Sequence, residues 1–351
     1  MITPFNDMTK TKINTEEYQL LLKDTVIANF SISNHNILDC TVIEGKENLL
    51  PYYLKQGNTA VGLNNFLINR HIDFTRSNAR VLLKKLGLRP TKSIMNVIDN
   101  YSLSLIDSYW TRPTNQNITY KEANLYDKIH KDFIVDTSLS GIETEVHKFE
   151  PNPELTNIGS FNKSWIFKDN EWRLYKKGTA YNYYVELLYY KLSNLLSIPC
   201  AHYQYDKDLQ MLYSVNITNK SCQLEHWDSI HDFQTNLDPS ILDSLSNMNA
   251  LDAITYNYDR HEFNYGVIRS TDTGEIIGQA KLFDHNLCLG VGGDGSDNGP
   301  LGLEMLKMDI DNSHNPTYGK MAKITEAQII NLDKEVKIQI QQENLDTTRQ
   351  V

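Results

Sequence analysis

The part of this sequence that most constrains its fold is a short polar loop between a helical segment and two short apolar segments. Residues 257–264 read NYDRHEFN. Before them, residues 239–257 place apolar side chains on one stripe at helical spacing, which predicts a helix that ends at the loop. After them, residues 265–268 and 279–283 are typical of two strands joined by a turn. We therefore expect the polar loop and Asp284, which follows the second strand, to face one pocket.

Three side chains in this region have the spacing of a phosphotransfer centre. Asp259 precedes Asn264 by five residues, and Asp284 follows after a further twenty. In phosphotransfer, one such group orients the acceptor hydroxyl and the other two hold Mg²⁺ against the nucleotide phosphates. Ordinary protein kinases place His and Arg before the Asp, whereas Arg260 and His261 follow it here. Taken alone, such a motif is more often a solvated turn after a helix, so the rest of the chain decides between the two interpretations.

Composition narrows the class of protein. The chain has 351 residues, a formal net charge of −10 and four cysteines without a CxxC pair. A chain of this length buries a large core without disulfides or structural zinc. The acidic balance argues against direct binding of nucleic acid, whose phosphates attract basic surfaces. No signal-peptide pattern and no run of eighteen apolar residues is present, so we expect no membrane segment. These features favour a cytoplasmic protein and leave export by another signal open.

Residues 1–150 predict a small N-terminal α/β module without a catalytic constellation. Apolar runs rich in β-branched residues favour strands, and apolar spacing of three to four residues favours helices. The expected strands are 25–32 and 40–43, and the expected helices are 61–68, 77–86 and 123–133. We interpret the aromatic and apolar segment 101–110 as a plug between this module and the rest of the chain. Pro151 and Pro153 interrupt the pattern, and we place the start of the catalytic core there.

The core is expected to begin with a β-hairpin. Residues 159–167 lead from a turn into a strand, residues 169–170 form a two-residue turn, and residues 171–176 form the return strand. Because side chains alternate along a strand, Lys176 shares a face with two apolar neighbours. We therefore expect Lys176 to point toward a cleft.

A helix should follow this hairpin, with an acidic residue in its second turn. Residues 179–197 have helical spacing, and Glu186 comes ten residues after Lys176. A strand Lys followed by a Glu on the next helix forms the ion pair that aligns nucleotide phosphates in kinases. For this pair alone, two surface residues without contact are the simpler interpretation. The remaining expected elements are strands at 203–205 and 209–215, a hinge at 216–219 and a helix at 324–344.

Four segments, in this order, resemble the HipA-like serine/threonine kinases of bacterial toxin–antitoxin systems. They read GSFNKSW, WRLYKKG, NYDRHEFNYGVI and AKLFDHNLCLG. The resemblance implies an α+β fold with a protein-kinase-like two-lobed core, in which a small β-rich lobe precedes a larger helical lobe. It places the catalytic core at 151–345, with the N-lobe at 151–218 and the C-lobe at 219–345. Residues 1–150 would be a HipA-like accessory module.

The resemblance also implies roles for single residues. Asp259 would be the catalytic base, and Asn264 and Asp284 would be the Mg²⁺ ligands. Lys176 would align the phosphates of ATP, with Glu186 as its partner. Two departures stand out: the loop at 159–163 has one glycine where ordinary kinases have three, and no glycine follows Asp284. The choice of Lys176 over the adjacent lysine rests on strand alternation.

Residues 159–163 would form the phosphate loop. The expected nucleotide contacts in it come from Gly159, Ser160, Phe161 and Lys163. In HipA-like kinases a serine of this loop can be autophosphorylated, and the candidates here are Ser160 and, second, Ser164. A phosphate would add about −1.5 to −2 charges beside the nucleotide phosphates, which predicts that the loop is expelled and the enzyme silenced.

We therefore expect an ATP- and Mg²⁺-dependent serine/threonine protein kinase. Its partners would be a protein substrate and, if it is a toxin, an antitoxin protein, because HipA-like toxins phosphorylate aminoacyl-tRNA synthetases and are held by a DNA-binding antitoxin. A phosphoinositide kinase is a second hypothesis, since DRHxxN also fits that class, but lipid kinases offer basic residues to anionic headgroups. A nucleotide-binding pseudokinase that serves as an interaction module is a third hypothesis. Retention of the base together with both metal ligands disfavours the third.

Overall fold

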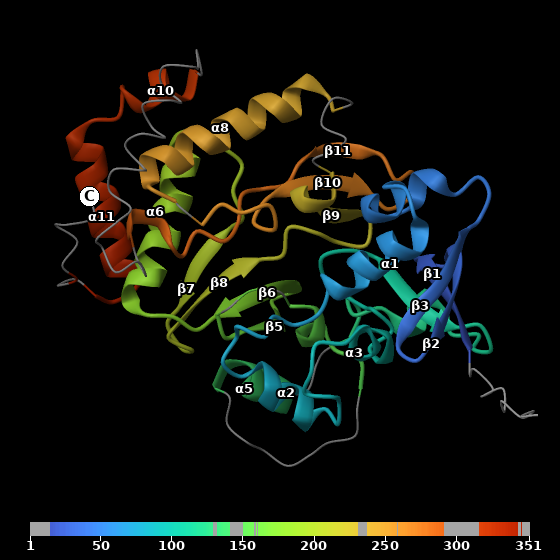
Figure 1. Ribbon diagram of the computed structural model, residues 1–351. Coiled ribbons are helices and arrows are strands. Elements are labelled where there is room, and N and C mark those ends of the chain that lie inside the picture. The colour runs from blue at the N-terminus through green and yellow to red at the C-terminus, as the bar shows by residue number, and fades with distance from the viewer. Residues whose placement is uncertain are drawn as a thin grey trace, which may run out of the picture.

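The chain folds into three antiparallel sheets with helices around them (Figure 1). The computed structural model describes residues 15–128, 132–140, 150–157, 159, 161–230, 237–257, 259–290, 316–342 and 345. The expected mixed α and β composition is confirmed, and the division into two lobes stays a prediction. No helix in these residues is long and apolar enough to cross a membrane.

The first sheet is N-terminal and has the strand order β3-β2-β1-β4. Its strands are β1 (Glu16–Leu22), β2 (Thr25–Ser33), β3 (Asn36–Val42) and β4 (Tyr109–Pro113). The expected strands at 25–32 and 40–43 correspond to β2 and β3. β1 and β4 were not expected, and they pair with each other across almost ninety residues of chain.

The N-terminal part also contains short helices, the first of which contacts β3. They are α1 (Thr59–Ile68), α2 (Ala79–Lys85), α3 (Ile94–Asp99), α4 (Tyr120–Ala123) and α5 (Asp132–Ser140). Asn58 caps α1 by accepting from two backbone N–H groups, as the expected helix start requires. Gly87 follows α2 with φ +68°, a left-handed conformation that suits glycine after a helix.

One helix prediction in this part was wrong. A helix over 123–133 was expected, but α4 ends at Ala123 and Asn124 is extended, with ψ 150°. Thr119 and Glu122 form a capping box that starts the helix earlier. The Asn124 side chain then donates to backbone carbonyls of α4 and ends the helix. Residues 129–131 lie outside the described part of the chain.

The second sheet has the strand order β5-β6-β8-β7. Its strands are β5 (Lys163–Lys168), β6 (Glu171–Lys176), β7 (Tyr203–Asp206) and β8 (Met211–Val215). Asp169 and Asn170 join β5 to β6 with φ values of 52° and 62°, which are those of a two-residue hairpin turn. This hairpin is as expected from the sequence.

The third sheet has the order β11-β10-β9, with β9 (Cys222–His226), β10 (Gly266–Ser270) and β11 (Ile276–Gln279). The expected strand at 279–283 is wrong, because β11 ends where that strand was to begin. The chain instead crosses to the second sheet, where Leu282 bridges Cys200 just before β7. The backbone N–H of Ala201 donates to the Leu282 carbonyl at 2.8 Å.

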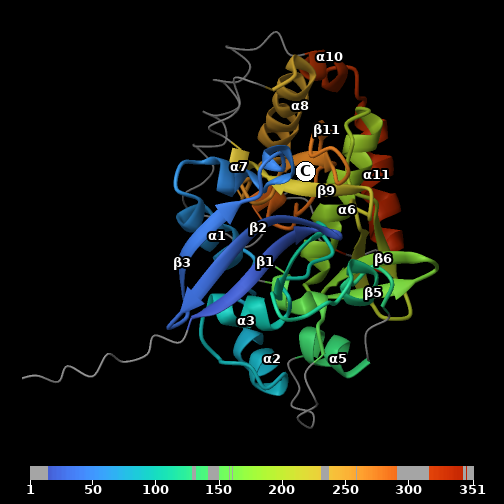
Figure 2. The ribbon, with the colours of Figure 1, turned by 90° about the vertical axis from the view of Figure 1, so that its right-hand side faces the viewer.

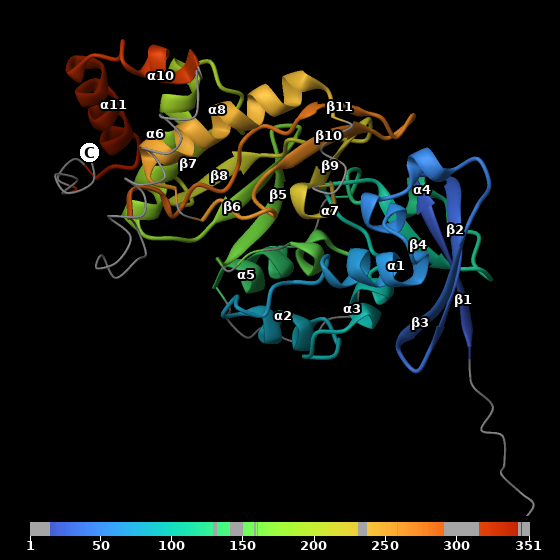
Figure 3. The same ribbon diagram turned by 45° about the horizontal axis from the view of Figure 1, so that its top comes forward.

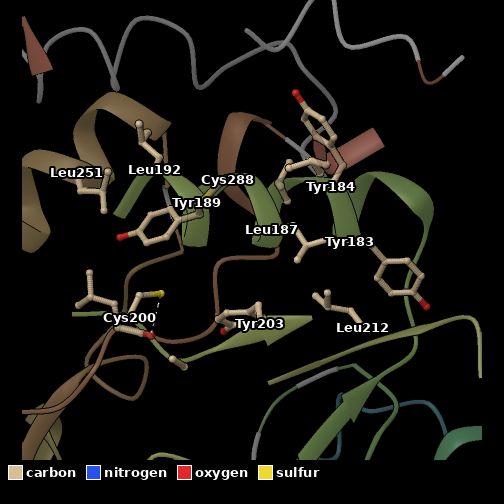
Figure 4. Close-up of a cluster of buried hydrophobic side chains, with 14 of the residues drawn as sticks. Tyr183, Tyr184, Leu187, Tyr189, Leu192, Cys200, Tyr203, Leu212, Leu251 and Cys288 are labelled. Carbon is tan, nitrogen blue, oxygen red and sulfur yellow. Dashed lines mark hydrogen bonds between the residues drawn. The ribbon is translucent and has the colours of Figure 1, made fainter. Parts of the chain in front are cut away.

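The later helices are α6 (Ala180–Leu195), α7 (Trp227–Ile230), α8 (Pro239–Thr255), α10 (Pro316–Met321) and α11 (Glu326–Gln339). Helices α6 and α11 lie side by side (Figure 1), where Tyr184 donates to Asp333 at 2.8 Å. An apolar core joins α6 to β7, β8 and α8. Figure 4 shows part of it, including Tyr184, Leu187, Tyr189, Leu192, Tyr203, Leu212 and Leu251.

The N-terminal part shares a core with the second sheet. Trp110 of β4 packs with Trp165 of β5 and Trp172 of β6, together with Leu103 and Leu105. The expected plug at 101–110 is therefore buried between these parts. Helices α2 and α5 lie next to each other near β5 (Figures 2 and 3). A domain boundary near residue 150 stays a prediction.

Candidate active site

A cavity of about 750 Å³ collects the residues that the sequence analysis singled out. This volume lies within the range of small-molecule and cofactor sites. Its walls come from the second and third sheets, from the loops at 259–264 and 283–287, and from the N-terminal segment 68–75. The lining includes the predicted residues Gly159, Phe161, Lys163, Lys176, Asp259, Asn264 and Asp284.

Lys176 stands at the end of β6 and bridges two carboxylates. Its Nζ lies 2.6 Å from Glu186 Oε1 and 2.8 Å from Asp284 Oδ1. Burial alone would lower the pKa of Lys176, but the charges of Asp284 and Glu186 outweigh it and raise that pKa above its usual value. Lys176 therefore points into the cavity, as strand alternation predicted, and it is a buried, charged group.

Glu186 reaches Lys176 because of where α6 begins. Thr179 and Asn182 form a capping box at the start of α6, which fixes the turn of helix that carries Glu186. The Glu186 side chain is 1% exposed and also accepts from the backbone N–H of His285 at 3.2 Å. The ion pair, which the sequence alone made the weaker interpretation, is present.

The polar loop after α8 brings Asp259 and Asn264 to the cavity. Tyr256 ends α8 in the left-handed conformation, with φ 55°, and turns the chain toward the site. Asn264 Nδ2 donates to the Asp259 backbone carbonyl at 3.0 Å, which fixes the amide and leaves its oxygen available as an acceptor. Burial raises the pKa of the Asp259 carboxyl, while His261 opposes this rise and Asp284 adds to it.

Asp284 adopts the left-handed conformation, with φ 59°. Asp tolerates this region better than most residues. Its backbone N–H donates to the Tyr203 hydroxyl at 2.9 Å. Burial alone would raise the pKa of Asp284, but the ammonium groups of Lys176 and Lys163 hold it well below its usual range. Asp284 is thus ionised and available as a ligand, although the glycine that follows this Asp in ordinary kinases is absent.

The oxygen atoms of Asn264 and Asp284 fit a magnesium ion as a partial ligand set. Mg²⁺ in nucleotide sites is held by one or two carboxylates or amides, with the phosphates and water completing the shell. In the described part of the chain there is no cluster of three His, Cys, Asp or Glu residues that could hold a metal by itself. The other ligands of a cation at this site would therefore come from a bound phosphate or from water.

Lys163 is a second lysine in the cavity and pairs in register with Lys176 across β5 and β6. Its side chain is almost fully buried, and burial lowers its pKa to about 8. Gly159 has φ +110°, and a Cβ there would lie 2.4 Å from Lys163 Nζ. Glycine at 159 therefore lets the loop backbone lie directly against this ammonium group.

Of the two serine candidates for autophosphorylation, the structure describes only Ser164. Ser160 lies outside the described residues. Ser164 is fully buried in β5, and its hydroxyl donates to Glu154 Oε1 at 2.9 Å. A phosphate could reach Ser164 only if the start of β5 opened.

Sequence reasoning missed two walls of the cavity. The N-terminal segment contributes His71, Asp73 and Thr75, among others, and β9 contributes Leu224 and His226. No motif marks these residues, because they reach the site only through the packing of distant segments. The buried ring nitrogens of His226 have no hydrogen-bond partner in the described part of the chain, and burial lowers the pKa of its imidazole to about 4.

Comparison with known proteins bears on the fold of this chain. No protein-family model matches the chain. No curated protein matches it either. Among solved structures, it is similar to HipA of Shewanella oneidensis MR-1, solved with HipB and operator DNA as a toxin–antitoxin system. The TM-score is 0.53 at 10% identity, over 94% of this chain and 100% of HipA.

A second solved structure is similar over a shorter stretch. The Helicobacter pylori proinflammatory kinase CtkA matches with a TM-score of 0.34 and 15% identity, over 52% of this chain and 92% of that one. The fold assignment rests on HipA. This chain has a fold similar to that of HipA.

Proposed function

We propose that this protein is an ATP- and Mg²⁺-dependent serine/threonine protein kinase of the HipA type. The observation that supports this best is the position of Lys176, whose ammonium joins Glu186 and Asp284 in the cavity that Asp259 and Asn264 also line. A binding module needs a cation for phosphates, but it has no need of a separate carboxylate base. The joint presence of these groups therefore favours catalysis over binding alone.

Each group has a role that its surroundings support. Lys176 is charged and held from two sides, so it can fix a phosphate oxygen without moving. Asp259 takes the proton of the acceptor hydroxyl while the hydroxyl oxygen attacks the γ-phosphorus and ADP leaves with the bonding electrons. Asn264 and Asp284 offer oxygen atoms to a magnesium ion, which when bound supplies positive charge to the phosphates.

The likeness to HipA supports a proposal on partners, and the loop at 159–163 supports one on regulation. We propose Ser160 as the site of autophosphorylation, because the alternative, Ser164, is buried. The similar HipA was solved with its partner HipB. For this chain we propose a protein substrate and a protein antitoxin, with no direct contact to nucleic acid, since its net charge is −10.

The test is phosphate transfer from γ-labelled ATP by the wild type and by Asp259→Asn. Removing a catalytic base lowers the rate by about 10²–10⁴-fold and leaves ATP affinity unchanged. Asp272→Asn is the matched control, because Asp272 is exposed in the β10–β11 turn and its carboxylate bonds Lys23, outside the cavity lining. It should keep wild-type activity.

Three results separate the hypotheses. Label on the wild type and on Asp272→Asn, but not on Asp259→Asn, supports the kinase. If the protein binds ATP but no label appears on the protein itself or on added peptide and protein substrates, the result supports a pseudokinase. Transfer to phosphoinositide vesicles but not to protein would favour a lipid kinase instead.

A further inference from the structure

Arg260, next to the proposed base, is buried and paired with a carboxylate of the preceding helix. Its Nε lies 2.8 Å from Asp252 Oδ2, and its Nη2 lies 3.1 Å from Asp252 Oδ1. Such a two-pronged pair fixes the plane of the guanidinium as well as its position. The neighbouring carboxylate raises the pKa of Arg260 further despite its burial, so the group is always charged.

The remaining N–H groups of Arg260 connect the two proposed metal ligands. Nη1 donates to the backbone carbonyl of Asn264 at 2.8 Å and to that of Phe283 at 2.7 Å. Nη2 also lies 2.8 Å from His285 Nδ1. One rigid group therefore contacts the backbone of the first ligand and both neighbours of the second ligand, Asp284.

The partners of Arg260 are themselves fixed. Asp252 also accepts from the Tyr189 hydroxyl at 2.9 Å and from Asn257 Nδ2 at 2.8 Å. The His285 ring stacks on the Tyr189 ring, with centroids 3.7 Å apart and an angle of 11° between the planes. Tyr189 belongs to the apolar core of α6 (Figure 4). The contacts of Arg260 are thus set by both α8 and α6.

We propose that Arg260 is a positioning residue that sets the distance between Asn264 and Asp284, and so makes one metal site from two separate loops. This inference rests on the proposed kinase function. Nothing else among the described side chains bonds both loops. A lysine could keep the charge beside Asp252, but it has no planar fork, and its three N–H donors cannot serve Asp252, two carbonyls and an imidazole at once.

The experiment compares Arg260→Lys with Arg269→Lys. Arg269 is a matched control, because it is fully buried, pairs with Glu225 at 2.7 Å, and donates to the carbonyls of Asn48 and Leu50. It does not line the cavity. Both substitutions remove a multiply bonded guanidinium and should cost similar stability, but only one of them concerns the metal ligands.

Two readouts are needed on full-length protein. The first is kcat for transfer from γ-labelled ATP, and the second is Mn²⁺ affinity by electron paramagnetic resonance at saturating ADP. Loss of a group that orients metal ligands typically costs 10- to 100-fold in affinity or activity. We expect Arg260→Lys to lose about this much in both, and Arg269→Lys to stay within about twofold of the wild type at equal folded fraction.

The inference is overturned if Arg260→Lys binds Mn²⁺ as the wild type does, or if Arg269→Lys loses as much. If the wild type transfers no phosphate, the proposed function fails, and the Mn²⁺ titration alone then decides the role of Arg260. His285→Phe serves if Arg260→Lys does not fold, because it keeps the stacking on Tyr189 and removes one acceptor of Arg260. It should weaken Mn²⁺ binding in the same direction, and unchanged binding would count against the role.

Discussion

The buried charge of Lys163 should lower the free energy of unfolding, so replacing this lysine with an uncharged residue should stabilise the protein. Lys163 lies buried beside Lys176, and among the described residues no side chain accepts a hydrogen bond from its Nζ. Lys163→Met keeps the unbranched chain and removes the charge. We expect the substitution to stabilise the nucleotide-free protein and, at the same time, to weaken ATP binding, because the cavity loses an ammonium group that faces the proposed phosphates.

The magnitude follows from the pKa of Lys163, which falls from 10.5 to about 8 on folding. One pKa unit corresponds to about 1.4 kcal/mol, so the charged lysine lowers the free energy of unfolding by roughly 3 kcal/mol at pH 7. Between pH 8 and 10.5 the unfolded chain binds more protons than the folded one. The penalty is therefore complete below pH 8 and fades as the pH rises, with about 1.4 kcal/mol left at pH 9.5.

The assay is urea denaturation of wild type and Lys163→Met at pH 7 and pH 9.5, with ATP affinity measured by titration calorimetry. The stabilisation should be up to about 3 kcal/mol at pH 7 and should fall by about half at pH 9.5. ATP affinity should drop by about 10- to 100-fold, since a charged hydrogen bond contributes about 1.5–3 kcal/mol.

Lys55→Met is the control for this prediction. Burial also lowers the pKa of Lys55 to about 8, with Arg269 adding to the effect, but Lys55 does not line the cavity. Its variant should show a pH-dependent stability change of the same sign and an unchanged ATP affinity. A destabilised Lys163→Met at pH 7, or a difference from wild type that does not shrink at pH 9.5, would refute the reasoning.

Two further variants test the same site. Gly159→Ala should lower the free energy of unfolding by about 1–2 kcal/mol, because φ is +110°, and should weaken ATP binding, because its Cβ would displace Lys163. Gly45→Ala is the control, with φ +75° and open space around its Cβ. In parallel urea and ATP titrations it should show only the loss of stability. Glu186→Gln should leave Lys176 held by Asp284 alone and reduce ATP affinity about tenfold by calorimetry. Wild-type affinity in Glu186→Gln would show that the ion pair does not orient the lysine.

The site residues that sequence reasoning placed well are those fixed by short-range geometry. Lys176 faces the cavity because a two-residue turn sets the register of β5 and β6 and because strand side chains alternate. Glu186 follows on a helix whose start is set by a local capping box. In such cases the pattern of ten or twenty residues contains the physical cause of the contact.

Elements that depend on distant partners were missed. β1 pairs with β4, and β9 pairs with β10, in each case across a long stretch of chain. The expected strand at 279–283 failed for the same reason, because Leu282 finds its backbone partners at Pro199 and Ala201 rather than in the hairpin. An apolar run favours a strand but does not specify which neighbour completes it.

The predicted phosphate loop, residues 159–163, shows how local and distant causes combine at the site. Arg76, far away in the sequence, donates to the Lys163 carbonyl at 2.7 Å and to the Ser138 carbonyl at 2.8 Å. Ser77 bonds Asn162 at 3.2 Å. The start of β5 is therefore held by the N-terminal part, and the position of Lys163 depends on residues that no kinase motif includes. The N-terminal part is thus a structural component of the candidate active site.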